Sequence, residues 1–289
     1  MTTTRKTVLG LGEVLWDIDR LRGTRTPGGA PINFAFYAAR RGLRGVAVSA
    51  VGQDAAGDEL LEACRSHGIE TEIARVDAPT GSAVAYLEAG EQRFRIEEEV
   101  AYDRIPCTER MLELARTAAA AAFGTLAQRC APSRDTIRRL LAAMPAEALR
   151  LYDINLRPPF YGRETVEASL EIADALKIND EELVVLQRMF DLPADEAAAV
   201  EALAARWGLR LVVLTAGARY SRVHTPEAVS LLPTPRVEIR EGENDTVGAG
   251  DAFTGTLVAE LLLGRPIVEA HRTAVETAAE VCRHRGAWI

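Results

Sequence analysis

The sequence predicts an α/β protein with three layers, in which helices cover both faces of a mainly parallel central sheet, together with a small separate β-sheet. Apolar runs of strand length alternate with segments of helical periodicity along almost the whole chain, which is typical of parallel sheets buried on both faces. Residues 80–103 break this alternation with two extended runs around "EAGEQ", which indicates a hairpin. No fixed-period repeat or low-complexity linker is visible, so we expect one domain over residues 1–289.

The expected elements follow one another in strand–helix order. "TVLGLG" (7–12) predicts the first strand, and "PINFAFYAARRG" (31–42) predicts a helix that ends at Gly42. "GVAVSAVG" (45–52) predicts the next strand and "GDELLEACRSHG" (57–68) the next helix. Further strands are expected beside Ala/Leu/Glu-rich helical stretches, at "AAAAFGTL", "LRLYDIN", "DALKIN" and "LRLVVLTAG".

Composition and charge exclude several classes of function. The chain is 48% hydrophobic and 26% charged, as ordinary globular proteins are. Its net charge of −8 argues against general binding to nucleic acid or to a membrane surface. No apolar run approaches the ~20 residues that span a bilayer, and acidic residues interrupt the amino-terminal run, so we expect no secretion signal. The four cysteines form no Cys-x-x-Cys pair, which predicts reduced thiols, neither a zinc site nor disulfides, and a cytoplasmic location.

"DTVGAGDAF" contains a candidate anion site. Gly248, Ala249 and Gly250 stand immediately before Asp251, where helical periodicity begins. The first turn of a helix has unpaired N–H groups and the positive end of the helix dipole, and glycines let a phosphate approach it closely. Asp251 is equally consistent with a helix cap. A carboxylate beside an anion hole has a chemical use as the base that deprotonates a hydroxyl attacking the phosphate.

The whole string resembles the carboxy-terminal signature of the ribokinase-like carbohydrate kinases, the phosphofructokinase B-type family. Other stretches match the family in its order: "GEVLWDI" (12–18), "GGAPINFAFYAARRG" (28–42), "INDEE" (178–182) and "VVLTAG" (212–217). The resemblance extends from about residue 7 to 287, and "YDINLRPPFY" and "FGTLAQR" are most similar to bacterial fructokinases. It implies the ribokinase-like fold and ATP-dependent phosphorylation of a sugar, with D-fructose as the leading acceptor.

The resemblance also implies roles for individual residues. Asp251 would be the catalytic base, and the amides of Gly248, Ala249 and Gly250 would form the anion hole. Five positions would bind the sugar: Asp17, Gly28, Gly29, Asn33 and Arg157. Thr215, Gly217 and Asn179 would bind ATP, and Glu182, with Asn179 acting through water, would organise Mg²⁺. Several of these residues have a structural alternative, such as a helix cap for Asn179 or a surface ion pair for Arg157.

The family likeness gives the hairpin a use. Segments of about 13–30 and 80–104 would form a β-sheet lid over the sugar, which excludes water, and we expect a homodimer through this lid. Tyr220 stands where the family usually has glycine, which leaves the shape of the nucleotide loop open. The carboxy-terminal residues also depart from the family, so K⁺ activation is left open.

Alternatives remain within and outside the kinase class. 2-Keto-3-deoxygluconate, ribose or a nucleoside would be other acceptors. A non-catalytic sugar or nucleotide binder is the alternative of another class. A dinucleotide-dependent dehydrogenase is disfavoured, because Leu15 stands where the third glycine of its motif should be.

Overall fold

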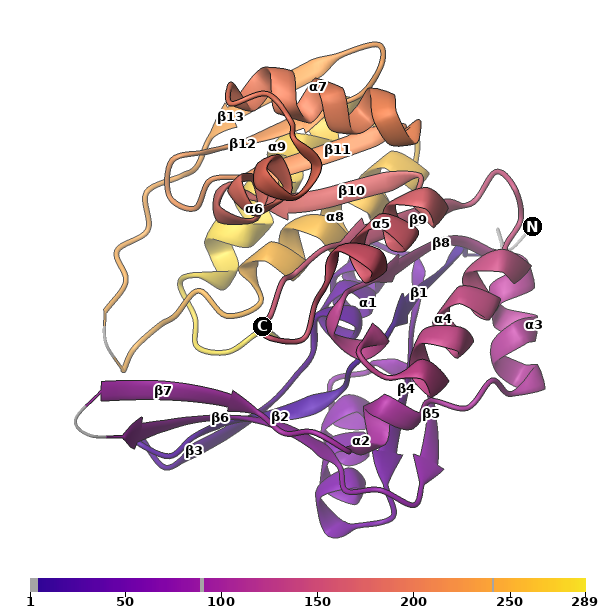
Figure 1. Ribbon diagram of the computed structural model, residues 1–289. Coiled ribbons are helices and arrows are strands. Elements are labelled where there is room, and N and C mark those ends of the chain that lie inside the picture. Colours follow the sequence, from indigo (N-terminus) through magenta and orange to yellow (C-terminus); the bar gives the residue numbers. More distant parts are fainter. Residues whose placement is uncertain (1–4, 89–90, 241) are drawn as a thin grey trace.

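The computed structural model describes residues 5–88, 91–240 and 242–289. Its main feature is a nine-stranded sheet in the order β13-β12-β11-β10-β9-β8-β1-β4-β5 (Figure 1). The strands β11, β10, β9, β8, β1, β4 and β5 are parallel to one another, whereas β12 and β13 at one edge pair antiparallel. Their bounds are β1 (Thr7–Leu11), β4 (Arg44–Gly52), β5 (Glu70–Val76), β8 (Ala118–Phe123), β9 (Leu149–Asp153), β10 (Ala175–Asn179), β11 (Leu211–Thr215), β12 (Tyr220–His224) and β13 (Val229–Pro233).

Helices cover both faces of this sheet, as predicted. One layer contains α1 (Ala30–Arg40), α2 (Ala55–Ser66), α8 (Ala249–Leu262) and α9 (Ile267–Val281). The other contains α3 (Glu109–Thr117), α4 (Ala131–Ala143), α5 (Arg163–Ile172), α6 (Asp180–Phe190) and α7 (Glu196–Trp207). Side chains of β1 alternate between the layers: Val8 packs with α1 and α8, whereas Leu9 and Leu11 pack with the second layer. The apolar runs therefore read as continuous because both faces are buried.

A second, four-stranded sheet lies apart from the first, and Figure 1 shows its strands extending together away from the helical body. Its order is β3-β2-β6-β7, with bounds β2 (Leu15–Asp19), β3 (Thr24–Gly28), β6 (Gly81–Glu88) and β7 (Glu91–Ile96). These strands lie within the two segments from which the sequence predicts the lid. The central pair, β2 and β6, is parallel, and the outer pairs are antiparallel. The predicted hairpin is β6–β7, and its tip at residues 89–90 lies outside the described residues.

Three predicted helices have boundaries that are wrong by one or two residues. The helix expected over 31–42 is α1 (Ala30–Arg40), and the one expected over 57–68 is α2 (Ala55–Ser66). The helix expected to begin at Asp251 begins two residues earlier, at Ala249, with Gly248 as its N-cap in the left-handed region (φ 77°). The expectation of a single apolar face along this helix is also too simple. Residues 252–260 are all buried, including Thr254, Thr256 and Glu260, because α8 packs between α1 and α9 and against the sheet.

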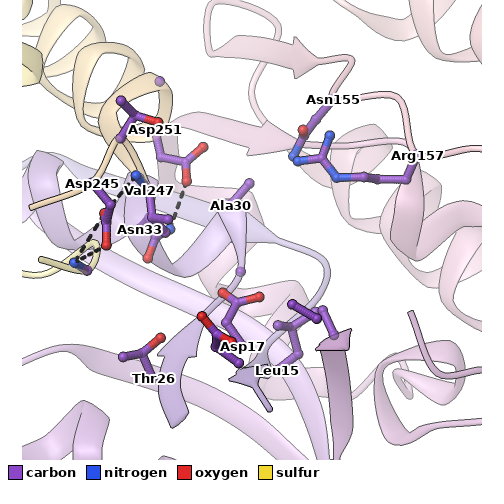
Figure 2. A pocket seen from close by; sticks show the side chains of 18 of the residues that line it. Leu15, Asp17, Thr26, Ala30, Asn33, Asn155, Arg157, Asp245, Val247 and Asp251 are labelled. Carbon is purple, nitrogen blue, oxygen red and sulfur yellow. Dashed lines mark hydrogen bonds between the residues drawn. The ribbon is translucent and has the colours of Figure 1, made fainter. Parts of the chain in front are cut away.

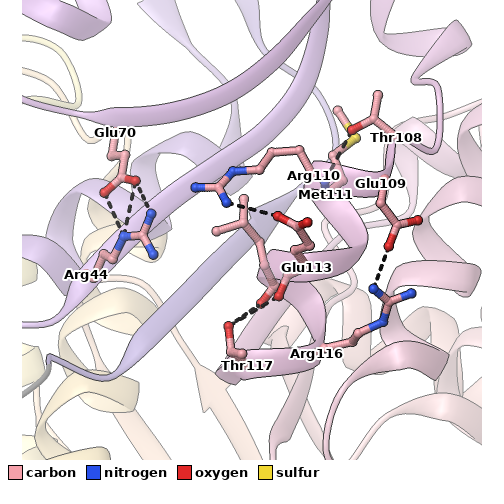
Figure 3. A network of polar contacts seen from close by, with 10 residues as sticks. Arg44, Glu70, Thr108, Glu109, Arg110, Met111, Glu113, Arg116 and Thr117 are labelled. Carbon is pink, nitrogen blue, oxygen red and sulfur yellow. Dashed lines mark hydrogen bonds and ion pairs between the residues drawn. The ribbon is translucent and has the colours of Figure 1, made fainter.

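Exposed ion pairs gather at the amino-terminal edge of the sheet, away from the carboxyl ends of the strands. Arg44 at the start of β4 pairs with Glu70 at the start of β5, and α3 carries the pairs Arg110–Glu113 and Arg116–Glu109 (Figure 3). Exposed pairs of this kind contribute only about 0.2–1 kcal/mol each. Among the described residues, no helix has the length and hydropathy needed to cross a bilayer.

Candidate active site

An open cleft of about 1060 Å³ lies between the two sheets. Its floor is made by residues at or just beyond the carboxyl ends of the parallel strands β1, β9, β10 and β11, where open α/β sheets bind ligands. Ten of the thirteen predicted site residues line it: Asp17, Gly29, Asn33, Arg157, Asn179, Thr215, Gly217, Gly248, Gly250 and Asp251. Gly28, Ala249 and Glu182 do not.

Asp251, in the first turn of α8, is held by a side chain from α1. The amide Nδ2 of Asn33 donates to Asp251 Oδ2 at 2.7 Å (Figure 2), and the indole Nε1 of Trp288 donates to Asn33 Oδ1 at 2.7 Å. Burial raises the pKa of Asp251, against the lowering effects of the Asn33 hydrogen bond and of Lys177 and Arg157 nearby. A base with a raised pKa is better matched to proton abstraction near neutral pH than an exposed aspartate is.

The loop before Asp251 has the geometry of an anion site. Gly248 tolerates no side chain, because a Cβ there would stand 2.5 Å from the Cβ of Ala287 and its φ is positive. Within the described part of the chain, the amides of Gly248, Gly250 and Asp251 donate to no protein acceptor, whereas the Ala249 amide donates to the Thr246 carbonyl at 3.3 Å. The free donors are therefore Gly248, Gly250 and Asp251, and the place of Ala249 in the anion hole stays a prediction.

The small sheet forms the opposite wall of the cleft. Asp17 on β2 is paired with Thr26 on β3, and both face the cleft in Figure 2. Gly28 lies beneath Asp17, since a Cβ at Gly28 would come within 2.3 Å of Asp17 Oδ2. Gly29, with φ 125°, lets the chain pass close to the carbonyl of Glu13 on its way into α1. Burial raises the pKa of Asp17 to about 6, although Arg157 opposes the shift.

Arg157 approaches from the loop after β9. Its guanidinium lies beside Asn155 at the edge of the cleft (Figure 2), and its one protein acceptor among the described residues is the adjacent Leu156 carbonyl. Asn155 adopts a positive φ of 40°, an uncommon conformation outside glycine that is often found at functional sites.

Asn179 and Glu182 cap α6. The Asn179 side chain accepts from the Glu182 amide at 2.7 Å, and Glu182 Oε2 accepts from the Asn179 amide at 2.8 Å. The other oxygen of Glu182 accepts from the Leu156 amide at 2.9 Å, and the side chain is only 6% exposed. No cluster of three or more metal-binding side chains exists among the described residues. Mg²⁺ fits this sparse set, because it keeps several waters and is bound mainly by phosphates, but Glu182 lies behind the cleft wall and would act through water.

Thr215 ends β11 and Gly217 lies just beyond it, and both line the same cleft. Tyr220, at the start of β12, is directed away from it. Its hydroxyl donates to Glu196 at the start of α7, and Arg219 lies over its ring. The bulk of Tyr220 therefore does not enter the described cleft.

Three charged residues near Asp251 escaped the sequence analysis. Lys177, in the middle of β10, and Asp153, at the end of β9, form a buried ion pair with an Nζ–Oδ1 distance of 3.1 Å. Glu13, only 4% exposed, lines the cleft, and burial raises the pKa of its carboxyl to about 7. Among the described residues its Oε2 has no hydrogen-bond partner. Lys177 and Asp153 belong to otherwise apolar strands. The one sequence signal that could have marked them is a charged residue in a strand that is buried on both faces.

A model of the pfkB family carbohydrate kinases matches residues 19–289. The chain belongs to this family. It is therefore an ATP-dependent carbohydrate kinase, and the resemblance recognised in the sequence is confirmed. The glycine loop and Asp251 lie within the matched region. Of the residues that line the cleft, Glu13, Leu15, Asp17 and Ile18 precede it.

Relatives and solved structures agree with the pfkB assignment. A sugar kinase of Pyrococcus horikoshii is 28% identical over 272 residues, which is 91% of this chain and 82% of that protein. Fructokinase-2 of Solanum lycopersicum is 26% identical over 257 residues, 85% of this chain and 75% of that protein. The crystal structure of a fructokinase with bound ATP from Xylella fastidiosa superposes with a TM-score of 0.84 at 25% identity, covering 98% of this chain and 94% of that one. The predicted ribokinase-like fold is thereby confirmed.

Proposed function

We propose that this pfkB enzyme transfers the γ-phosphoryl group of ATP to a hydroxyl of D-fructose, with Asp251 as the general base. Asp251 takes the proton of the attacking hydroxyl as the oxygen bonds to the γ-phosphorus and the bond to ADP breaks. Amides of the Gly248–Gly250 loop and of Asp251 stabilise the charge on the transferring group. The donors are fixed before reaction, so their stabilisation costs no reorganisation; one such donor contributes about 3–4 kcal/mol.

The observation that carries the proposal is the contact between Asn33 and Asp251 at the mouth of the anion loop. The 2.7 Å hydrogen bond joins a carboxylate oxygen in the first turn of α8 to Asn33, which is proposed to bind the sugar. Lys177 adds positive charge beneath the loop, since its Nζ is 3.4 Å from the point where a Cβ on Gly250 would stand. A base, an anion site and a sugar wall thus converge in one cleft.

Recognition of the sugar falls to the small sheet and α1. Asp17 accepts hydrogen bonds from sugar hydroxyls, Asn33 contributes its amide, and Arg157 closes the site from the side of β9. Gly28 and Gly29 keep the wall thin enough for close approach. Fructose is proposed over 2-keto-3-deoxygluconate, ribose or a nucleoside because several relatives and solved structures that resemble this chain are named fructokinase.

Thr215 and Gly217 are proposed to hold the nucleotide together with Asn179, which lines the same cleft. Mg²⁺ bound to the ATP phosphates would supply charge neutralisation. Asn179, backed by Glu182, would hold its waters. Asp245 uses its carboxylate to accept the amides of Val247 and Gly286, and its own amide donates to the His284 carbonyl. These bonds tie the loop before α8 to residues 284–286, and matched assays with and without K⁺ test activation by this cation.

Two further features stay proposals. The small sheet would act as a lid and as the contact of a homodimer, and Leu87 on β6 is 60% exposed there. Light scattering across a concentration series tests the dimer. A cytoplasmic location is proposed from the cysteine usage alone.

The test is an ADP-release assay with Mg²⁺-ATP, a panel of sugars and nucleosides, and matched series with and without K⁺. Fastest turnover with fructose is expected. Fastest turnover with another acceptor keeps the mechanism and overturns the substrate. Absence of turnover with every acceptor, with ATP still bound, favours a non-catalytic binder.

A further inference from the structure

Residues 284–288 pack against residues 245–248, the segment that leads into α8. The amide of Gly286 donates to the Asp245 carboxylate, and the carbonyl of Ala287 accepts the hydroxyl of the buried Tyr37 at 2.6 Å. Ala287 fills the space that a side chain at Gly248 would need. Trp288 then places its ring beside Phe36 on α1 and His67 after α2, with centroid distances of 6.2 and 5.1 Å. Its indole ring is therefore fixed in place.

The indole of Trp288 dictates which way the amide of Asn33 points. An indole N–H can only donate, so the Asn33 atom at 2.7 Å from Nε1 must be the carbonyl oxygen. That choice leaves the NH₂ group facing Asp251, where it donates at 2.7 Å. Asn33 is only 4% exposed, so solvent does not compensate for a wrong orientation.

We infer that Trp288 is a positioning residue for Asp251, acting through Asn33. The inference rests on the proposed role of Asp251 as the base. An NH₂ group facing the carboxylate favours its ionised, proton-accepting form. A flipped amide would instead present its oxygen, which repels the ionised carboxylate and accepts a hydrogen bond from the protonated one. The donor-only indole excludes the flipped state.

Other charged and titratable groups surround Asp251 and act on it in every variant alike. They come from β2, β9, β10, α1 and the loops after β1 and β9: Asp17, Asp153, Lys177, Tyr37, Glu13 and Arg157. A change confined to Trp288 leaves this set intact. A displaced acid limb in such a variant therefore reports the Asn33 amide.

The experiment compares Trp288→Phe with the wild-type kinase and with Trp207→Phe as a matched control. Phenylalanine at 288 keeps a ring against Phe36 and His67 and lacks the donor. Trp207 packs on Phe190 at the end of α7, outside the cleft, and its substitution is expected to change nothing. For Trp288→Phe we expect kcat to fall about tenfold or more, the acid limb of kcat/KM to rise by about one pH unit, and KM for ATP to stay unchanged.

A double-mutant cycle isolates the route. The same substitution is then made in an Asn33→Ala variant, whose residual activity is measured. There Trp288→Phe should lower kcat by less than about twofold, because the side chain that links Trp288 to Asp251 is already absent. An unmoved acid limb, or an undiminished effect in that background, overturns the inference and leaves only packing. If Trp288→Phe is poorly folded, the benzothiophene analogue of tryptophan at position 288 removes the N–H alone and should give the same two shifts.

Asp251→Asn distinguishes the two levels of argument. Full activity in that variant contradicts the proposed function itself. Loss of activity in Asp251→Asn together with a wild-type pH profile in Trp288→Phe contradicts only the positioning role.

Discussion

Lys177 and Asp153 form a buried ion pair beneath Gly250 in the glycine loop, with Nζ 3.1 Å from Oδ1. Both side chains are about nine-tenths buried, on adjacent parallel strands. Burial raises the pKa of Asp153. Burial would lower the pKa of Lys177, but the negative charges around it, Asp153 foremost, raise it. The pair therefore keeps a cation under Gly250 that solvent hardly screens.

Removal of the lysine should separate its structural part from its chemical part. We expect Lys177→Met to lower the free energy of unfolding by about 3–5 kcal/mol, because Asp153 is left buried without its partner. Lys177→Met should also be inactive, because the cation beneath Gly250 is lost. The double variant Asp153→Leu/Lys177→Met should regain most of the stability and stay inactive. Urea unfolding and kcat measure the two effects. Activity restored in the double variant would show that the cation has no part in the reaction.

Gly28→Ala should weaken sugar binding selectively. The added Cβ would stand 2.3 Å from Asp17 Oδ2, so the Asp17 carboxylate must move. We expect KM for the sugar to rise about tenfold, comparable to one hydrogen bond to a charged group, while KM for ATP is unchanged. Gly162→Ala is the matched control, because Gly162 has open space around its Cβ position and lies outside the cleft. Equal changes in both KM values would place Gly28 in the general framework instead.

Glu13→Gln should alter how stability depends on pH. The folded-state pKa of Glu13, about 7, is raised above the ordinary 4.5. The contribution of Glu13 to the free energy of unfolding is therefore fully present below about pH 4.5 and is lost as the pH rises towards 7. Glutamine does not ionise. The stability of Glu13→Gln relative to wild type should therefore increase by on the order of 3 kcal/mol between about pH 4 and about pH 8.

Urea unfolding across that pH range checks the Glu13 prediction. The exposed Glu147, outside the cleft, gives the control Glu147→Gln. A stability difference that stays flat with pH would mean that Glu13 is not held protonated by the fold.

The layered fold and the glycine loop at the start of α8 could be predicted because their signals are local. The alternation of strands and helices follows from apolar periodicity, and the glycines before Asp251 lie next to it in the chain. Trp288 could not be predicted, since its partner Asn33 is 255 positions away and no spacing marks the contact. The sequence reveals only the bulk of Tyr220, and the hydrogen bond of its hydroxyl to Glu196 at the start of α7 shows that the side chain turns away from the cleft.

The most direct test of the central claim uses Asp251→Asn, a change that keeps the shape of the side chain and removes its basicity. With the best acceptor from the sugar panel, kcat should fall by about 10²–10⁴-fold. The acceptor's Kd, measured by calorimetry, should stay within about threefold, because no net loss of a hydrogen bond is expected. Turnover near the wild-type rate, or loss of acceptor binding in step with turnover, would contradict Asp251 as the base.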